Sequence, residues 1–97
     1  MIFETLEHAQ KAGAAPWDDH VSVYRDRFPV TQGHLLFVPK HNTPGIINEA
    51  FCSAQFEGNR MVDAGECDGY NIGLNMGPAA GQTVIYPHVH LIPRRVG

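Results

Sequence analysis

The sequence predicts an α+β fold in which an antiparallel sheet packs with one long helix and a short N-terminal helix. Apolar stretches of strand length come in two pairs, residues 20–24 with 34–38 and residues 69–75 with 83–93. Between the pairs, residues 43–65 carry apolar side chains at the spacing of a helix. Short, turn-rich connections favour hairpins over parallel crossovers, so we expect the sheet to be antiparallel.

The first half of the chain supplies a helix and two strands. Residues 2–12 predict the short helix, because apolar residues recur there at intervals of three and four, at Ile2, Phe3, Leu6, Ala9 and Ala12. The alternation in 20–24 predicts a strand, and Pro29 with its polar neighbours predicts a turn. The nearly continuous apolar run over 34–38 predicts a buried central strand with His34 at its mouth.

The long helix has signals at both ends. Thr43 is a suitable N-cap, Pro44 suits the first helical position, and Gly65 is placed to end the helix. One face gathers small and apolar residues, namely Ile47, Ala50, Phe51, Ala54, Gly58, Met61 and Val62.

Strict alternation in the last strand predicts which side chains share a face. One face holds Val84, Tyr86, His88, His90 and Ile92, and the other holds Ile85, Pro87, Val89, Leu91 and Pro93. Two histidines therefore lie side by side, about 7 Å apart along the strand. Immediately upstream, the glycine-rich stretch from Gly77 to Thr83 predicts a loop whose N–H groups cradle an anion.

Composition narrows the possible partners. The 97 residues, 43% hydrophobic and 18% charged, predict one globular domain over residues 1–97. A formal charge of −3 with scattered cations argues against a nucleic-acid partner. The acidic N-terminal residues do not fit a signal peptide, and no apolar run has the length of a membrane span. We expect no membrane partner, a cytoplasmic location, and reduced Cys52 and Cys67.

The segment from Gly81 to Arg94, GQTVIYPHVHLIPR, resembles the signature of the histidine triad (HIT) superfamily of nucleotide hydrolases and transferases. Tyr86 stands where the first histidine of that signature falls. Residues 26–41 and 71–77 resemble two further blocks of the same family, so the resemblance spans about residues 18 to 95.

The resemblance implies a role for each matching residue. His88 would be the nucleophile that attacks an α-phosphorus and forms a nucleotidyl-histidine intermediate. His90 and Thr83 would share in catalysis, His90 by binding a phosphate oxygen and Thr83 by assisting the leaving group. The remaining implied roles are phosphate binding by His34, Asn75 and Gln82, ribose binding by Asp26, and, at Tyr86, a contact with the substrate and support of the nucleophile. Phe3, Phe28 and Ile46 are candidates for the base pocket.

The resemblance also implies the ligands and the assembly. The expected partner is a purine nucleotide or a nucleotide conjugate, such as a dinucleoside polyphosphate or a nucleoside phosphoramidate. A homodimer joined through the long helix and an adjacent strand is expected. Neutral imidazoles suit attack on a negative phosphate near pH 7, and no Mg²⁺-binding carboxylate cluster accompanies them, so no cofactor is expected.

Two alternatives stay open at this point. His34, His88 and His90 form a possible three-histidine zinc site, which stoichiometric zinc in the purified protein would support. A non-catalytic nucleotide sensor or interaction module is the other alternative, and Tyr86 is the residue that suggests it.

Overall fold

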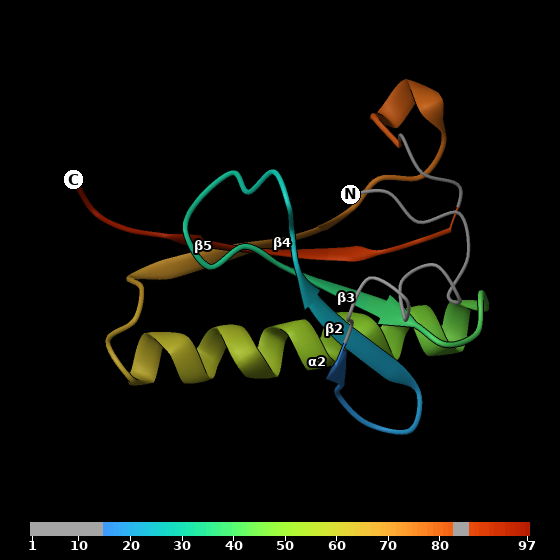
Figure 1. Cartoon of the computed structure of the whole chain (residues 1–97), viewed down its shortest axis with the longest axis horizontal. Coiled ribbons are helices and arrows are strands. Elements are labelled where there is room, and N and C mark those ends of the chain that lie inside the picture. Colours follow the sequence, from blue (N-terminus) through green and yellow to red (C-terminus); the bar gives the residue numbers. More distant parts are fainter. Residues whose placement is uncertain (1–14, 83–85) are drawn as a thin grey trace.

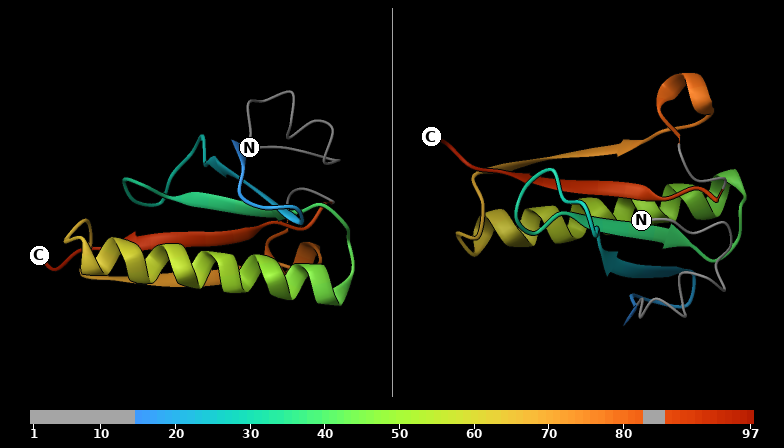
Figure 2. Two further views of the ribbon diagram at one scale, coloured as in Figure 1. Left: turned by 90° about the horizontal axis from the view of Figure 1, so that it is seen from below. Right: turned by 45° about the horizontal axis from the view of Figure 1, so that its top comes forward.

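A computed structural model of the chain describes residues 15–82 and 86–97. In the described part, the elements are β1 (Ala15–Pro16), β2 (Val21–Arg25), β3 (Leu35–Pro39), α2 (Pro44–Asp63), β4 (Gly69–Leu74), the 3-10 turn η1 (Pro78–Ala80) and β5 (Val89–Arg94). The strands form one antiparallel sheet in the order β1-β2-β3-β5-β4, and α2 runs along one of its faces (Figures 1 and 2). The predicted α+β fold is confirmed, whereas the helix expected over residues 2–12 lies outside the described residues.

β3 is the central strand and is buried on both faces. Phe37 points to the helix side, where it joins a core that includes Ala50, Ala54 and Met61 of α2. Leu36 and Val38 alternate with it and point to the opposite face, yet both are also almost fully buried. The continuous apolar run therefore predicted the position of this strand correctly.

The helix begins and ends where its capping residues predict. The Thr43 side chain accepts a hydrogen bond from the Ile46 N–H at 3.4 Å, Pro44 is the first helical residue, and Gly65 takes φ +75° just past the end. Ala50, Ser53, Ala54, Gly58 and Met61 are its buried residues. Near its C-terminal end, Gly58 lies directly against the Tyr70 ring of β4, so the helix approaches the sheet closely there.

In the described residues the last strand begins at Val89, so residues 86–88 do not belong to it as the alternation predicted, and residues 83–85 lie outside the described part of the chain. Its register pairs Phe37 with Val89, and two residues further it would bring Pro39 opposite Pro87. Neither proline has an N–H to donate, so the backbone ladder stops. The predicted alternation of faces still holds from Tyr86 to Pro93, where buried residues alternate with half-buried ones. None of the helices in the described residues is long and apolar enough to cross a membrane.

Candidate functional site

The face of the sheet opposite α2 presents a row of paired residues across four strands. Tyr24 pairs with Leu36, Leu36 pairs with His90, and His90 pairs with Gly73. Side chains of directly opposite residues share a face, so His90 lies between an apolar neighbour and a residue without a side chain. A Cβ atom at Gly73 would meet nothing within 4 Å, which leaves open space beside the His90 ring.

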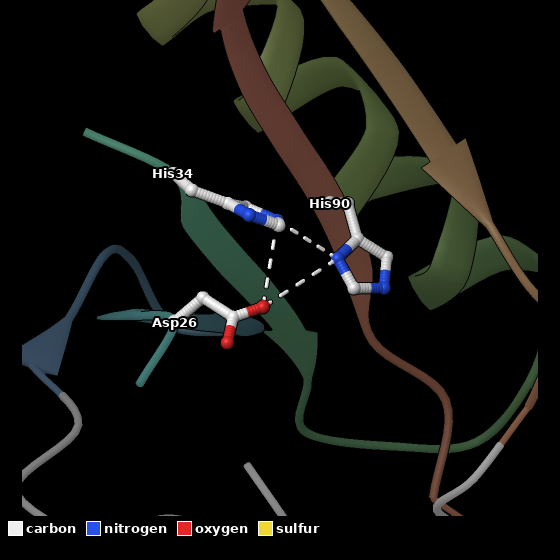
Figure 3. Close-up of side chains that lie close together, drawn as sticks. All are labelled: Asp26, His34 and His90. Atoms are coloured by element: carbon white, nitrogen blue, oxygen red, sulfur yellow. Dashed lines mark hydrogen bonds and ion pairs between the residues drawn. The ribbon is translucent and has the colours of Figure 1, made fainter. Parts of the chain in front are cut away.

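Asp26, His34 and His90 converge on this face from three separate segments (Figure 3). Asp26 follows β2, His34 precedes β3, and His90 belongs to β5. His34 Nε2 lies 3.0 Å from His90 Nδ1, and the Oδ2 atom of Asp26 lies 3.5 Å from the former and 4.0 Å from the latter. The other Asp26 oxygen accepts the Phe28 N–H at 2.9 Å, which fixes the carboxylate in the turn.

The direction of each hydrogen bond can be worked out from the backbone. The Val30 N–H donates to His34 Nδ1 at 3.1 Å, so that nitrogen carries a lone pair and the proton of neutral His34 is on Nε2. His34 Nε2–H then donates to His90 Nδ1. The proton of His90 is therefore on its Nε2, which lies on the side of the ring away from Asp26 and His34 (Figure 3). One backbone amide thus makes His90 an outward-pointing N–H donor.

Burial keeps both imidazoles neutral. Desolvation is the main cause that lowers the pKa of His90 to about 4, and the neighbouring His88 and His34 add to it. Burial also lowers the pKa of His34, although the charge of Asp26 opposes the shift. Protonation of His90 Nδ1 would set two N–H groups against each other, so the hydrogen-bond directions favour the same neutral state.

His88 has the opposite polarity. Its Nδ1 lies 3.0 Å from the backbone oxygen of Tyr86, and a carbonyl oxygen can only accept. Nδ1 therefore carries the proton, and Nε2 is left with an available lone pair. The His88 ring packs edge-on against His90, with 5.0 Å between ring centroids. A nitrogen lone pair and an N–H donor thus lie on neighbouring rings.

Tyr86 is tied to the backbone. Its hydroxyl donates to the Pro39 oxygen at 2.5 Å, and burial raises the pKa of the phenol, which keeps that proton in place. The single hydroxyl proton is therefore committed to Pro39 and not to His88 or to a ligand.

The glycine loop differs from the anion cradle that the sequence predicted. The N–H groups of Ala80, Gly81 and Gln82 donate to carbonyls within the loop, those of Gly77 and Pro78. The Gly77 N–H donates to the Gln82 side-chain oxygen at 2.7 Å. These four N–H groups therefore already have acceptors within the loop. Gln82 closes the loop with its side chain, and Thr83 lies outside the described residues.

A cavity of about 270 Å³ opens beside the convergent side chains. It is lined by Asp26, Phe28, Val30, His34, Gly73, Asn75, His90 and Ile92. Phe28 and Val30 form an exposed apolar rim, 76% and 60% accessible. Of the residues expected at a base pocket, Phe28 lines this cavity, Ile46 is not among the lining residues, and Phe3 lies outside the described part of the chain.

The same three side chains bear on the zinc alternative. Single ligand atoms of Asp26, His34 and His90 lie within 4.8 Å of one another, and His88 is not part of that cluster. A histidine that binds a metal needs a lone pair on the ligating nitrogen and usually donates its other N–H to an acceptor. His34 has the reverse arrangement, because its Nδ1 faces the Val30 N–H. The geometry favours a hydrogen-bond network over the three-histidine zinc site.

The described structure therefore brings together four of the predicted site residues, Asp26, His34, His88 and His90. Asn75 joins them at the cavity, whereas Gln82 and Tyr86 hold the backbone. Sequence reasoning missed Gly73 and the Val30 amide. The alternation of residues 69–75 contained a signal for Gly73, since a glycine there leaves a gap on the polar face, but a backbone amide has no signal in sequence.

A model of the HIT domain family matches residues 10–97. Adenylylsulfatase HINT3 of Arabidopsis thaliana is 35% identical over 85 residues, which are 80% of this chain and 43% of that protein. The asymmetrical bis(5'-nucleosyl)-tetraphosphatase of Schizosaccharomyces pombe is 34% identical, over 69% of this chain and 41% of that protein. The chain therefore spans less than half the length of these two relatives.

Solved structures give the same fold. A zinc-bound histidine triad family protein of Mycobacterium smegmatis superposes with a TM-score of 0.83 at 29% identity, covering 96% of this chain and 76% of that one. A HIT family member of Bacillus subtilis superposes with a TM-score of 0.74, also at 29% identity, covering 95% and 74%.

Proposed function

The chain belongs to the HIT domain family, and on this premise we propose that it is a nucleotide hydrolase or nucleotidyl transferase with His88 as its nucleophile. His88 Nε2 attacks the α-phosphorus of a nucleotide conjugate, the bond from phosphorus to the leaving group breaks, and a nucleotidyl-histidine forms. Water or another acceptor then attacks the same phosphorus and releases His88. Tyr86 occupies the position of the first histidine of the family signature.

The observation that carries this proposal is the opposite polarity of the two neighbouring imidazoles. His88 Nδ1 faces a carbonyl, so in the neutral ring the Nε2 lone pair is available for attack. His90 receives a hydrogen bond on Nδ1, so its Nε2–H is available to a phosphoryl oxygen. Charge that develops on phosphorus oxygens is stabilised by such a fixed donor, without any proton transfer.

The cavity supports a nucleoside as the part of the substrate that is bound. Its rim offers Phe28 and Val30 to an apolar, flat base, and the Asp26 carboxylate is available as an acceptor for ribose hydroxyls. Asn75 lies on the exposed side, where it can donate to the phosphate. We assign Thr83 a contact with the leaving group from the family signature alone. A homodimer through α2 and an adjacent strand, with the nucleotide bound in each subunit, belongs to the same proposal.

Charge favours substrates with few phosphates. None of the described residues that line the cavity is Lys or Arg, and Asp26 adds a negative charge. The neutral His34 and His90 offer hydrogen bonds but no countercharge. A nucleoside phosphoramidate or another conjugate with a single phosphate should therefore be a better substrate than a dinucleoside tetraphosphate, whose extra charges find no Lys or Arg among the described residues that line this cavity.

The test is a screen of adenosine and guanosine phosphoramidates and dinucleoside polyphosphates, with a rapid quench to trap the covalent adduct. On wild type we expect a mass increase of one nucleotidyl group, which is a nucleoside monophosphate less one water. In His88→Ala we expect turnover to fall by about 10⁴-fold or more. His41→Ala, which removes an exposed histidine, is the matched control and should retain activity.

Two outcomes would contradict this proposal. Tight nucleotide binding by both wild type and His88→Ala, with turnover by neither, would support the sensor alternative. Turnover that survives in His88→Ala would remove His88 as the nucleophile.

A further inference from the structure

The segment that bears the nucleophile lies beyond the end of the backbone ladder. β3 and β5 pair as far as Phe37 and Val89, and the register then brings Pro39 opposite Pro87. Because proline has no backbone N–H, these two residues cannot donate hydrogen bonds to each other. Backbone hydrogen bonds therefore do not hold residues 86–88 against β3. On the other side, the pairing of β4 with β5 also ends at Val89, opposite Leu74.

Tyr86 supplies the missing connection with its side chain. The phenol hydroxyl donates to the Pro39 oxygen at 2.5 Å, at the point where the ladder lacks a donor. Pro39 is fully buried at the end of the central strand, so its carbonyl is a fixed anchor. A phenol donates a hydrogen bond only while it is protonated. Burial holds the pKa of Tyr86 above its ordinary value, so the hydroxyl keeps its proton.

The same residue also orients the nucleophile. His88 Nδ1 donates to the backbone oxygen of Tyr86 at 3.0 Å. A chain of two hydrogen bonds therefore runs from the central strand to the His88 ring: the Pro39 carbonyl holds the Tyr86 side chain, and the Tyr86 carbonyl holds the imidazole. The first of these bonds uses the side-chain hydroxyl of Tyr86, and the second uses its backbone oxygen.

We propose that Tyr86 is a positioning residue that replaces the interrupted strand ladder and thereby fixes the tautomer and orientation of His88. This inference rests on the proposed function for the role of His88, but the hydrogen-bond chain itself does not depend on turnover. Tyr86 acts through its hydroxyl on Pro39, and not by contact with the substrate. A tyrosine at this position is then a working substitute for the family's histidine and does not mark an inactive protein.

The test removes the hydroxyl alone, in Tyr86→Phe. In wild type, imidazole ¹⁵N resonances should report His88 with its proton on Nδ1. In Tyr86→Phe we expect a mixture of the two tautomers, and a kcat for adduct formation lowered about tenfold with little change in KM, because the misaligned ring is still exposed to bound substrate. Tyr86→His, which restores a ring N–H donor, should recover part of both readouts.

Tyr70→Phe is the matched control. It removes another tyrosine hydroxyl, one that donates to Asn59 Oδ1 at 2.6 Å next to the long helix. We expect it to lower stability by a similar amount and to leave the His88 tautomer and kcat unchanged. Both variants are compared at a temperature at which each is folded.

The proposal is overturned if Tyr86→Phe keeps the wild-type tautomer and kcat, or if Tyr70→Phe disturbs both to the same extent. The failure of the proposed function gives a different result. Wild type would then form no adduct with any conjugate, while the tautomer shift between wild type and Tyr86→Phe would still decide whether Tyr86 positions His88.

Discussion

The two faces of the sheet are built on different principles. The α2 face is apolar, and its contacts are side chains such as Phe37, Val89 and Leu91 packed on helix residues. The opposite face buries polar groups, and what matters there is which atom donates and which accepts. His34 is only 3% exposed, yet its function depends on a single amide, that of Val30.

This difference determines what each face tolerates. On the apolar face, stability depends on the apolar area that is buried and on how well side chains fill the core. A substitution there lowers stability in proportion to the atoms it removes. On the polar face, one reversed donor changes the protonation of the next ring, so chemistry is lost before stability is. The predictions below test this contrast, starting from the largest effect.

The largest effect is expected in the apolar core. Phe37→Ala removes a fully buried ring beneath α2 and should lower the free energy of unfolding by about 3–5 kcal/mol, measured by urea denaturation. Phe56→Ala removes the same side chain from a position that is 68% exposed, and we expect a change of about 1 kcal/mol or less. Equal losses in the two variants would contradict the assignment of the core to this face.

The second prediction fills the space beside His90. Gly73→Val adds a side chain where nothing lies within 4 Å, so we expect the fold to accept it. On the site face the new side chain occupies the cavity, and KM for a nucleotide conjugate should rise about tenfold or more. Gly69→Val is the control in the same strand, since its Cβ also meets nothing within 4 Å but it pairs with Arg94, far from His90. A similar KM for both variants would show that the cavity does not bind the nucleotide.

The third prediction separates two roles for Gln82. If its side chain holds the loop, Gln82→Glu keeps an acceptor for the Gly77 N–H, while Gln82→Ala loses it. We therefore expect Glu to remain within about threefold of wild type in kcat/KM, and Ala to fall by about tenfold. Direct binding of the phosphate chain predicts the reverse order, because a carboxylate would repel the phosphates. Amide hydrogen exchange at Gly77 provides a readout that does not depend on activity.

The sequence predicted the apolar face better than the polar one, for physical reasons. Caps and periodicity are local signals, so Thr43 and Gly65 located both ends of α2. Alternation also placed His88 and His90 on one face of the strand, as their half-buried positions between buried neighbours bear out. Residues 86–88 were wrongly predicted to be part of the last strand, because the ladder depends on what lies opposite Pro87, and that residue, Pro39, is 48 residues away in the chain.

Hydrogen-bond direction was the part of the site that could not be predicted. The network of Asp26, His34 and His90 joins three segments, and its polarity comes from the Val30 backbone. Four N–H groups of the glycine loop, those of Gly77, Ala80, Gly81 and Gln82, are bonded within the loop, because composition indicates a turn but not the partners that its N–H groups find. Side-chain identity therefore predicts which residues gather, and backbone geometry decides what each of them does.

The smallest effect is expected from a hydrogen bond on the helix side of the sheet, between His20 and Glu49. His20 Nδ1 lies 2.7 Å from Glu49 Oε1, linking the start of β2 to α2, and the two side chains are 50% and 45% exposed. The hydrogen bond and charge of Glu49 raise the pKa of His20 above 6.5. The pKa of His20 is higher in the folded protein than in the unfolded chain. Its interaction with Glu49 therefore stabilises the fold fully below the unfolded pKa, and this stabilisation is lost as the pH rises through the folded pKa.

We therefore expect wild type to melt slightly above His20→Gln at about pH 5.5, and the two Tm values to converge by about pH 8.5. Because both side chains are exposed to solvent, the difference in Tm should be small, and added salt should reduce it further. A gap that widened with pH would mean that His20 contributes as a neutral side chain. The buried imidazoles of the other face are kept neutral by burial and by a backbone donor, whereas His20 is free to titrate. On the helix side of the sheet, a histidine therefore adds a small, pH-dependent contribution to stability and specifies no chemistry.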